Sequence, residues 1–574
     1  MEIKHAYETI VIGGGAAGLF FGAAAPAGRD ILILEKTKQT GTKLLMSGSG
    51  QCNLTHCGSI KEFLLCYGKN GNKIRTCLYR HSNLALCRFM EGLGVSLIER
   101  EDGKIFPRSM DAREVRGVLL HSCAQNGVTI RTQAEVTAIR ALPQRNADNC
   151  GSKQTNRFRS QASDATASDA RDDAADTSFT PAAASGTQSK DDAADINMQP
   201  ACTDKDVPKG ICKAIAVQQI AAASPNADVR SAAPPPAPRC ANAAASDTDD
   251  AGPGAQANDD PAPCEKAQFD CAPDLGAGFA LTLADGTCLA CRNLVIAAGG
   301  ASYPTTGSDG TLLDILALAP PAGLGIPIVL PRPALTPIFI ENYPFADLAG
   351  ISLRDIELKI FSKPQENLCG EQTRSMTEEA APMFSKKNKK QTKPQSAVGD
   401  LLLTHKNLSG PVILNHAREI SAGTRLAINF VFPYTVDTVI SRLKADFSGC
   451  RSMISAYIGE QYHLPKRFVA KILHLISLTD KPLAAISGSQ IRALSEALAA
   501  WPCTVSGTGG FREAMATAGG VSLDAVNLSS MECRDYPGLF FAGEMLDIDG
   551  DTGGYNLQFA YASAMAALTK IYRS

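Results

Sequence analysis

The chain has 574 residues, of which 44% are hydrophobic and 20% charged, and its formal net charge is −2. This is the balance of an ordinary soluble protein, and the length allows two to four domains and a large core. No apolar run reaches the roughly 18 residues that a spanning helix needs, which excludes a transmembrane helix.

The N-terminal sequence MEIKHAYETIVIGGG has neither a basic region before an apolar segment nor a cleavage site. It predicts a strand that opens a domain rather than a signal peptide, and we therefore expect a cytoplasmic protein. The 18 cysteines are then expected to be free thiols. One CxxC, Cys288 to Cys291, falls on a predicted strand, where its two thiols face opposite ways. We therefore expect buried thiols there and no metal site.

A glycine motif follows the first predicted strand, residues 7–12. Gly13, Gly15 and Gly18 form GxGxxG directly before a helical stretch that Pro26 should end. In this setting the first glycine permits a tight turn, the second lets the backbone approach a pyrophosphate, and the third lets helix pack on strand. The helix N-terminus offers amide donors to the phosphates. The motif therefore predicts a dinucleotide site.

A second strand, residues 30–35, ends in Glu35, which lies 22 residues after Gly13. An acid at this distance typically binds the ribose of the adenosine. Further on, residues 128–139 predict a pair of strands by their alternation, and residues 278–290 predict a hairpin that turns at Asp285-Gly286.

The stretch between these strands, residues 141–276, is rich in Ala, Asp, Ser and Pro. It carries 12 basic and 20 acidic residues, so the rest of the chain has a net charge of +6. Such a composition cannot bury enough apolar surface to offset its ordering entropy, and it predicts a disordered insertion in a loop. Residues 209–223 form an isolated strand or short helix within it on this interpretation. A polar run, residues 385–395, predicts a second loop, with a basic nucleic-acid patch as the alternative.

Three glycine-rich stretches point to one long ligand: residues 41–56, residues 294–304 and residues 538–560. The last two begin with apolar strands, so the chain returns to one sheet from distant places. This arrangement suits FAD, which extends across the sheet. The acids and glycines of residues 543–560 would then hold the flavin half, with backbone amides at the following helix start facing the ring.

No second GxGxxG opens another βαβ unit, so NAD(P)H, the expected reductant, would reach the flavin without a Rossmann domain of its own. Candidates for a proton donor remain open. They are Tyr303, His405, Tyr555 and Cys52. A packing or surface role is the alternative for each of them.

Several motifs together resemble the BaiN/RdsA family of bacterial FAD-dependent oxidoreductases. They are GGGAAGL (13–19), TKLLMSGSGQCNLTH (42–56), AAGGASYPTTGSDG (297–310), LLLTHKNLSGP (401–411), TAGGV (517–521) and residues 538–567. The resemblance covers residues 1–140 and 277–574. It implies an α/β fold in which a split Rossmann-like FAD-binding domain carries an inserted β-barrel-like and small helical domain.

On this resemblance the expected FAD-binding parts are residues 1–140, 277–334 and 511–574, with the inserted domain at 335–510. Within the second motif, the usual text RKLLISGGGRCNLTN is changed at Thr42, Ser49, Gln51 and His56, so two arginines near the cofactor are absent. The expected cofactor contacts are Gly13, Gly15, Ala16, Ala17, Gly18, Glu35, Lys36, Lys43, Ser47, Gly48, Cys52, Asn53, Val136, Ala298, Gly299, Gly300, Glu544, Gly553, Gly554, Tyr555 and Asn556.

The resemblance further implies reduction of a conjugated C=C bond of a small molecule by hydride from flavin that NAD(P)H has reduced. Family members differ in substrate, so reduction of a uridine in large-subunit ribosomal RNA and oxidation of aminoacetone are alternatives. A flavin-binding protein without turnover is a further alternative. The oligomeric state and the identity of the substrate are left open.

Overall fold

The computed structural model describes residues 5–142, 278–320, 322–361, 394–446 and 451–573. Ala141 and Leu142, the first two residues of the predicted insertion 141–276, belong to a strand instead. The rest of that insertion, with its possible element at 209–223, and nearly all of the predicted loop 385–395 lie outside the described residues. Among the described residues, no helix combines the length and apolar character needed to cross a membrane.

A nine-stranded sheet forms the centre of the main body, with the path β18-β19-β20-β9-β1-β2-β6. The strands are β1 (His5–Ile12), β2 (Ile31–Leu34), β6 (Thr129–Arg131), β7 (Val136–Leu142), β8 (Gly278–Leu283), β9 (Cys288–Ile296), β18 (Val526–Asn527), β19 (Glu532–Cys533) and β20 (Leu539–Phe541). The run β20-β9-β1-β2-β6 is parallel. Three segments far apart in sequence therefore meet side by side, as their buried apolar runs predicted.

Two of the sequence predictions near β7 have different outcomes. The hairpin at Asp285-Gly286 is confirmed, since β8 and β9 pair antiparallel. The expected pairing within residues 128–139 is wrong: β6 pairs with β2 and β7 pairs with β8. Alternation predicted both strands correctly, but it contains no information about which partner completes each ladder.

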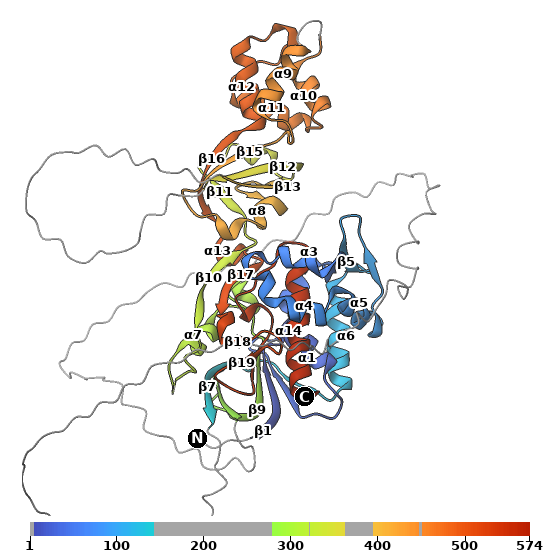
Figure 1. The fold of residues 1–574 in the computed structure, drawn as a ribbon, viewed down its shortest axis with the longest axis vertical. Helices are drawn as coiled ribbons and strands as arrows, with labels where there is room; N and C mark the ends of the chain where they lie inside the picture. The colour runs from blue at the N-terminus through green and yellow to red at the C-terminus, as the bar shows by residue number, and fades with distance from the viewer. Residues whose placement is uncertain (1–4, 143–277, 321, 362–393, 447–450, 574) are drawn as a thin grey trace, which may run out of the picture. The chain divides into compact units, whose positions relative to one another are not determined.

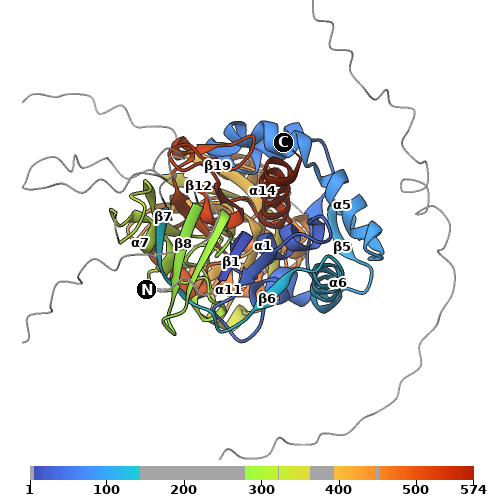
Figure 2. The same cartoon turned by 90° about the horizontal axis from the view of Figure 1, so that it is seen from below.

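Helices pack against the sheet beside β1. They are α1 (Ala16–Ala24), α6 (Ala112–Gln125) and α14 (Tyr555–Tyr572), which gather in Figure 2. Phe20 and Phe21 of α1 are fully buried, and the Phe20 ring lies 5.5 Å from that of Tyr561 on α14. Burial of each such ring stabilises the fold by about 1.5–3 kcal/mol. Helix α1 ends at Ala24, shortly before Pro26, as the missing proline N–H requires.

A smaller layer follows β2 in the chain and packs beside α14. It contains α2 (Thr42–Met46), α3 (Ile60–Leu65), α4 (Arg75–Arg80) and α5 (Asn83–Gly92), and a three-stranded sheet of β3 (Thr55–His56), β5 (Lys104–Pro107) and β4 (Leu97–Glu99). On the other side of the sheet path, α7 (Thr311–Ala317) follows the glycine-rich turn after β9. These elements surround the carboxyl ends of the parallel strands.

An inserted body is entered through β10 (Ile328–Ala334) and left through β17 (Ala516–Val521), which pair antiparallel. It is a closed barrel of β11 (Ile338–Ile340), β12 (Ser352–Phe361), β13 (Gln395–Leu403), β14 (Leu408–Ser409), β15 (Arg425–Asn429) and β16 (Trp501–Thr508). The helices α8 (Pro411–Leu414), α9 (Val436–Ala445), α10 (Ile454–Gln461), α11 (Lys466–Leu475), α12 (Gly488–Ala499) and α13 (Gly510–Glu513) belong to the same stretch.

The barrel and its helices share a hydrophobic core that is separate from the core of the main sheet. Helices α9–α12 all lie between β15 and β16 in the chain, and Figure 1 shows them together at one end of the barrel. Closing the sheet removes its exposed edges. The predicted fold class, a split Rossmann-like domain with an inserted barrel and helices, is therefore confirmed, and the predicted limits 335–510 stay a proposal.

Candidate functional site

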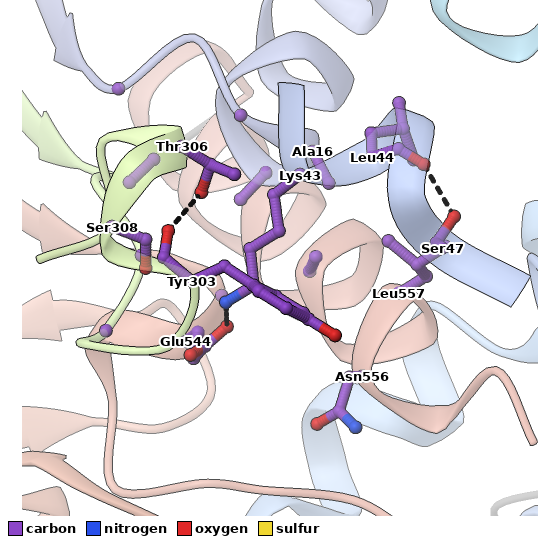
Figure 3. Close-up of a pocket in the computed structure, with 18 of the residues that line it drawn as sticks. Ala16, Lys43, Leu44, Ser47, Tyr303, Thr306, Ser308, Glu544, Asn556 and Leu557 are labelled. Carbon is purple, nitrogen blue, oxygen red and sulfur yellow. Dashed lines mark hydrogen bonds and ion pairs between the residues drawn. The ribbon is translucent and has the colours of Figure 1, made fainter. Parts of the chain in front are cut away.

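A cavity of about 760 Å³ lies where the parallel strands end. Its walls come from the turn after β1, the start of α1, α2 with the turn that follows it, residues 297–300 after β9, residues 542–544 after β20, and the start of α14. Figure 3 shows side chains from several of these segments converging on it. In open α/β sheets, this edge is where ligands bind.

The glycine motif shapes the wall at the start of α1. Gly13 has φ +108°, and a Cβ there would lie 2.4 Å from the Ala297 carbonyl oxygen. A Cβ at Gly18 would lie 2.0 Å from the Gly13 oxygen, so this glycine lets α1 pack on the turn. Nothing lies within 4 Å of a Cβ at Gly15, which lines the cavity. The amides of the α1 N-terminus are thus accessible to an anionic group.

Glu35 directly follows β2 at one end of the cavity and is 7% exposed. Its carboxylate accepts hydrogen bonds from the backbone N–H of Gly14 at 3.0 Å and from the N–H and hydroxyl of Thr37 at 2.8 and 2.7 Å. These bonds fix the carboxylate where a ribose would approach. Beside it, Lys36 pairs with Asp309 at 2.6 Å and with Glu135 at 3.6 Å.

The middle of the cavity holds a charged cluster that joins three segments. Lys43 Nζ lies 2.5 Å from Ser302 Oγ and 2.6 Å from Glu544 Oε2, and the Ser302 hydroxyl donates to Glu544 Oε1 at 2.6 Å. Figure 3 shows the Lys43–Glu544 pair beside the Tyr303 ring. Lys43 and Glu544 line the cavity, and this donor and acceptor suit a polyhydroxyl chain, whereas the fully buried Ser302 holds both of them from behind.

The far end of the cavity is formed by Gly553 and Gly554 at the start of α14. Both have positive φ, +128° and +95°, and a Cβ at Gly554 would lie 2.7 Å from the Thr55 backbone. Oriented to satisfy its neighbours, the Asn53 amide accepts from the Gly554 N–H at 3.2 Å and donates to Thr55 O at 2.9 Å. The turn is thus packed tightly, and the dipole of α14 is directed at the cavity.

Two of the acids before these glycines are held by one arginine. Arg418, which follows α8, donates to Asp549 Oδ2 at 2.7 Å and forms a short ion pair with Asp551. Burial raises the pKa of Asp551 to about 6 and also raises that of Asp549. Asp547 accepts from Gly519 N at 3.0 Å. These three acids therefore have partners within the protein.

The four proton-donor candidates have different surroundings. Tyr303 lines the cavity, and its ring reaches the centre in Figure 3. Its backbone has φ +52°, and its N–H donates to the Phe511 carbonyl at 2.9 Å. Such a conformation is unfavourable for a non-glycine residue and persists only where neighbours enforce it. Burial raises the pKa of its phenol.

The other three candidates do not line the cavity. His405 is exposed in the turn between β13 and β14. Tyr555 stacks on His56 at 5.6 Å between ring centroids and packs edge-on against Phe63. Cys52 is fully buried, and burial raises the pKa of its thiol to about 12. The structure thus supports packing or surface roles for these three side chains.

Of the 21 residues expected to contact the cofactor, 18 line the cavity. The exceptions are Gly18, Cys52 and Tyr555, which pack behind its wall. Whether the lining residues bind a cofactor stays a prediction. Ser308 also lines the cavity, and its buried hydroxyl has no hydrogen-bond partner among the described residues. The donor and acceptor pattern of a dinucleotide fits three features of this cavity: the unpaired Ser308 hydroxyl, the unobstructed backbone at Gly15 and the carboxylate of Glu35.

Sequence reasoning missed Arg418, Ser302 and Arg100. Arg418 lies in the inserted body, and no motif marks it. Arg100 lines the cavity and donates to Gln51 Oε1 at 2.9 Å, so a guanidinium from β4–β5 reaches a place where the family text has an arginine. Cys288 and Cys291 are both buried on β9, and the described residues contain no cluster of potential metal ligands.

Comparisons with known proteins agree with this architecture. The family model described as "HI0933-like protein Rossmann domain" matches residues 7–163 and 269–570. A ribosomal RNA dihydrouridine synthase of Haemophilus influenzae is 23% identical over 567 residues, covering 99% of this chain and 98% of that protein. A 3-dehydro-bile acid delta(4,6)-reductase of Clostridium scindens is 25% identical over 302 residues, covering 50% of this chain and 64% of that protein.

Among solved structures, the open conformation of a flavocytochrome c3 fumarate reductase matches 99% of this chain and 79% of that chain, with 10% identity and a TM-score of 0.36. The family model itself covers well over half of the sequence on both sides of residues 164–268. The chain therefore belongs to the HI0933-like family of Rossmann-fold flavoprotein oxidoreductases.

Proposed function

We propose that this protein binds FAD and reduces a C=C bond conjugated to a carbonyl group. The observation that carries the proposal is one continuous cavity that runs from the ribose acceptor Glu35 to the glycine turn at Gly553–Gly554. The residues at its two ends and the donors between them suit an extended dinucleotide. When bound, the reduced flavin would supply the hydride.

The residues of this chain would divide the binding between them. The α1 amides beside Gly15 would hold the pyrophosphate, and Glu35 would accept from the ribose. Lys43 and Glu544 would contact the ribityl region, where their ion pair already places a donor and an acceptor. The amides at Gly553–Gly554 would stabilise negative charge on the flavin pyrimidine. A cytoplasmic enzyme is proposed, because the ten cysteines among the described residues form no disulfide.

Tyr303 is the proposed proton donor. Reduction of a conjugated C=C bond needs a hydride at one carbon and a proton at the other, and Tyr303 alone among the four candidates lines the cavity. Replacement by Phe keeps the ring but removes the hydroxyl. We expect Tyr303→Phe to slow substrate reduction by roughly 10²–10⁴-fold while NAD(P)H still reduces the flavin. Equal loss in both half-reactions would contradict this role.

A uridine in ribosomal RNA is the substrate that we favour. Uracil contains a C=C bond conjugated to a carbonyl, so its reduction to dihydrouridine is the same reaction class. The similarity to the dihydrouridine synthase extends over 99% of the chain, against 50% for the bile-acid reductase. The mildly basic net charge outside residues 141–276 is consistent with this proposal, in which NAD(P)H is the proposed reductant.

Three measurements test the proposed function. The purified protein should be yellow and should release FAD on heating. NADH or NADPH should then bleach the flavin absorbance. Large-subunit ribosomal RNA from knockout cells should lack a dihydrouridine that wild-type cells contain. Release of FMN alone, or of no flavin, would contradict FAD binding. Unchanged dihydrouridine together with reduction of an unsaturated steroid would favour the bile-acid type of substrate.

A further inference from the structure

The β4–β5 hairpin forms the wall of the cavity nearest the start of α14. Lys104 and Phe106 of β5 both line the cavity. Strand β5 pairs with β3, where Thr55 lies opposite Ile105, and a Cβ at Gly554 would lie 2.7 Å from the backbone of the same threonine. The hairpin is therefore one strand away from the glycine turn that ends the cavity.

Charge is distributed unevenly along the cavity. Glu35, Glu135 and Asp309 line the ribose end, where Lys36 is paired with two of them. At the opposite end, the charged lining residues of the hairpin are both basic, Arg100 and Lys104. Asp551 lines this region as well, but it is paired with Arg418. The hairpin end is thus suited to an anion that the ribose end would repel.

Arg100 presents its guanidinium at the open end of the cavity. Its Cζ lies 4.2 Å from the centroid of the Phe106 ring, and Nη2 donates to Gln51 Oε1 at 2.9 Å. Within the described part of the chain, no carboxylate forms an ion pair with Arg100, whereas Lys104 pairs with Asp102 at 2.6 Å. Nη2 also lies 3.9 Å from Met110 Sδ, and the donors on Nε and Nη1 have no partner in the described part of the chain, so they can bind a ligand.

Solvent reaches this end of the cavity. Arg100, Gly48 and Ser49 are exposed, and the adjacent Met46 is 45% exposed although it also lines the cavity. A guanidinium that is stacked on an aromatic ring and reached by solvent offers a contact for a phosphate.

We propose that Arg100, supported by Lys104, forms a subsite for the phosphate of a nucleotide at this open end. The inference rests on the proposed function, in which the flavin lies near Gly553–Gly554. A nucleotide phosphate has two sources in that reaction: the phosphodiester backbone of an RNA substrate, and the phosphates of NAD(P)H. The same bidentate guanidinium contact serves both, and the experiment separates them.

The experiment uses the full chain loaded with FAD. Variants Arg100→Gln and Lys104→Gln are compared with Arg108→Gln, which alters an exposed arginine that follows β5 and does not line the cavity. Dissociation constants are measured at two salt concentrations for a short uridine-containing RNA hairpin and for NADPH. Inorganic phosphate serves as competitor.

We expect Arg100→Gln to raise at least one dissociation constant about tenfold or more, because a charge-assisted contact is lost. The slope of log K against log salt should fall by about 1 for RNA. Lys104→Gln should act in the same direction but less, and Arg108→Gln should leave both ligands unaffected. Arg100→Lys should keep most of the salt dependence but recover only part of the affinity, since its donors are not planar.

The outcomes separate cleanly. An effect on RNA alone assigns the subsite to the substrate, and an effect on NADPH alone assigns it to the reductant. Unchanged constants for both ligands in Arg100→Gln would overturn the inference, even if the protein is yellow and reducible by NAD(P)H. Loss of FAD from this variant with unchanged ligand binding would assign Arg100 to the cofactor and overturn it as well. Absence of flavin from the wild type would instead refute the proposed function.

Discussion

Gly15 differs from its neighbours Gly13 and Gly18 in what surrounds it. A side chain at Gly13 or Gly18 would collide with backbone, whereas nothing lies within 4 Å of a Cβ at Gly15. Its backbone is extended, with φ −79° and ψ −165°, which any residue adopts. A methyl group at this position would therefore disturb a ligand in the cavity but not the fold.

We predict that Gly15→Ala weakens FAD binding by about 1–3 kcal/mol, as overpacking does. The unfolding free energy of the apoprotein should stay within about 0.5 kcal/mol of wild type. Gly117→Ala, within α6 and also facing open space, is the control and should keep full flavin affinity. Flavin titration and thermal unfolding measure both quantities. Full flavin affinity in Gly15→Ala would place the pyrophosphate elsewhere.

Burial raises the pKa of the Asp551 carboxyl group, and the charge of Arg418 offsets only part of this rise. Burial raises its pKa from an ordinary 3.8 to about 6, and the nearby carboxylate of Asp549 acts in the same direction. The folded state therefore binds a proton more tightly than the unfolded state. Stability from this group is present at low pH and is lost as pH rises from about 4 to about 6.

We expect Asp551→Asn to flatten this dependence. The shift corresponds to about 3 kcal/mol, so the unfolding free energy of the wild type should fall by up to about that much more than that of the variant between pH 4 and pH 7. Urea unfolding at several pH values measures the difference. Parallel pH curves for the two proteins would show that another group accounts for the dependence.

Strands β7 and β8 end side by side, with Leu142 opposite Gly278. The residues between them in sequence lie outside the described residues, but the strand pair itself is well packed, with Ile139 and Leu281 opposite each other and both buried. Residues 143–277 therefore start and finish at adjacent points of one ladder. A two-residue turn is long enough to join antiparallel strands at such a point.

We predict that residues 143–277 can be replaced by Asn-Gly without loss of FAD or of the unfolding temperature. The control is a second deletion variant, which lacks residues 139–281 and therefore also lacks the buried Ile139–Leu281 pair. It should unfold at a lower temperature because the ladder and part of the core are lost. Flavin occupancy and calorimetry distinguish the two. Poor soluble expression of the first protein would mean that the replaced residues fold or dock.

Arg418 connects the inserted body to the main body. It follows α8 of the inserted stretch, and its partners Asp549 and Asp551 precede the glycine turn of α14. Asn415 strengthens the connection, since its side chain accepts from Thr552 N at 2.8 Å. The Arg418 side chain is 15% exposed, so its removal would leave two largely buried acids without their cation.

We predict that Arg418→Met destabilises the protein by about 3–5 kcal/mol and lowers FAD occupancy. Adding Asp549→Asn and Asp551→Asn should recover much of the stability, because the uncompensated charges disappear with the arginine. Arg492→Met, at a side chain that is 72% exposed, is the matched control and should cost less than about 0.5 kcal/mol. A wild-type unfolding curve for Arg418→Met would refute the connection.

The sequence predicted the local parts of this architecture better than the long-range contacts. The glycine motif, Glu35 and the strand before Glu544 could be recognised because each has a short pattern whose physics is local. Three of the four proton-donor candidates, His405, Tyr555 and Cys52, lie within or beside family motifs, but their side chains do not line the cavity. Tyr555 and Tyr303 each adjoin a glycine motif, and only packing against Phe63 or support from Phe511 determines which one reaches the cavity.

Contacts that join distant segments left no signal in one sequence. The acids of residues 547–551 suggested solvent or ligand, because the partner Arg418 lies more than 120 residues away. Likewise, the sequence showed only that Gln51 stands where the family text has an arginine, and the structure shows that Arg100 of the β4–β5 hairpin brings a guanidinium to Gln51. The strands of residues 128–139 were placed correctly, but their partners depend on the assembled sheet.

The order of strands in the main sheet has a consequence for biosynthesis. Strand β9 pairs with β1 on one side and with β20 on the other, and α14 packs against α1. The first and the last segments of the described chain therefore complete the same sheet and the same layer of helices. At about 5–20 residues per second, the ribosome needs roughly half a minute to two minutes to add the last of them. During that interval the nascent chain exposes an unfinished sheet edge and cannot enclose its ligand. We therefore expect chaperones to bind the nascent chain before the ribosome releases it. A nonsense mutation before residue 539 should yield a fragment that aggregates rather than an enzyme with lower activity.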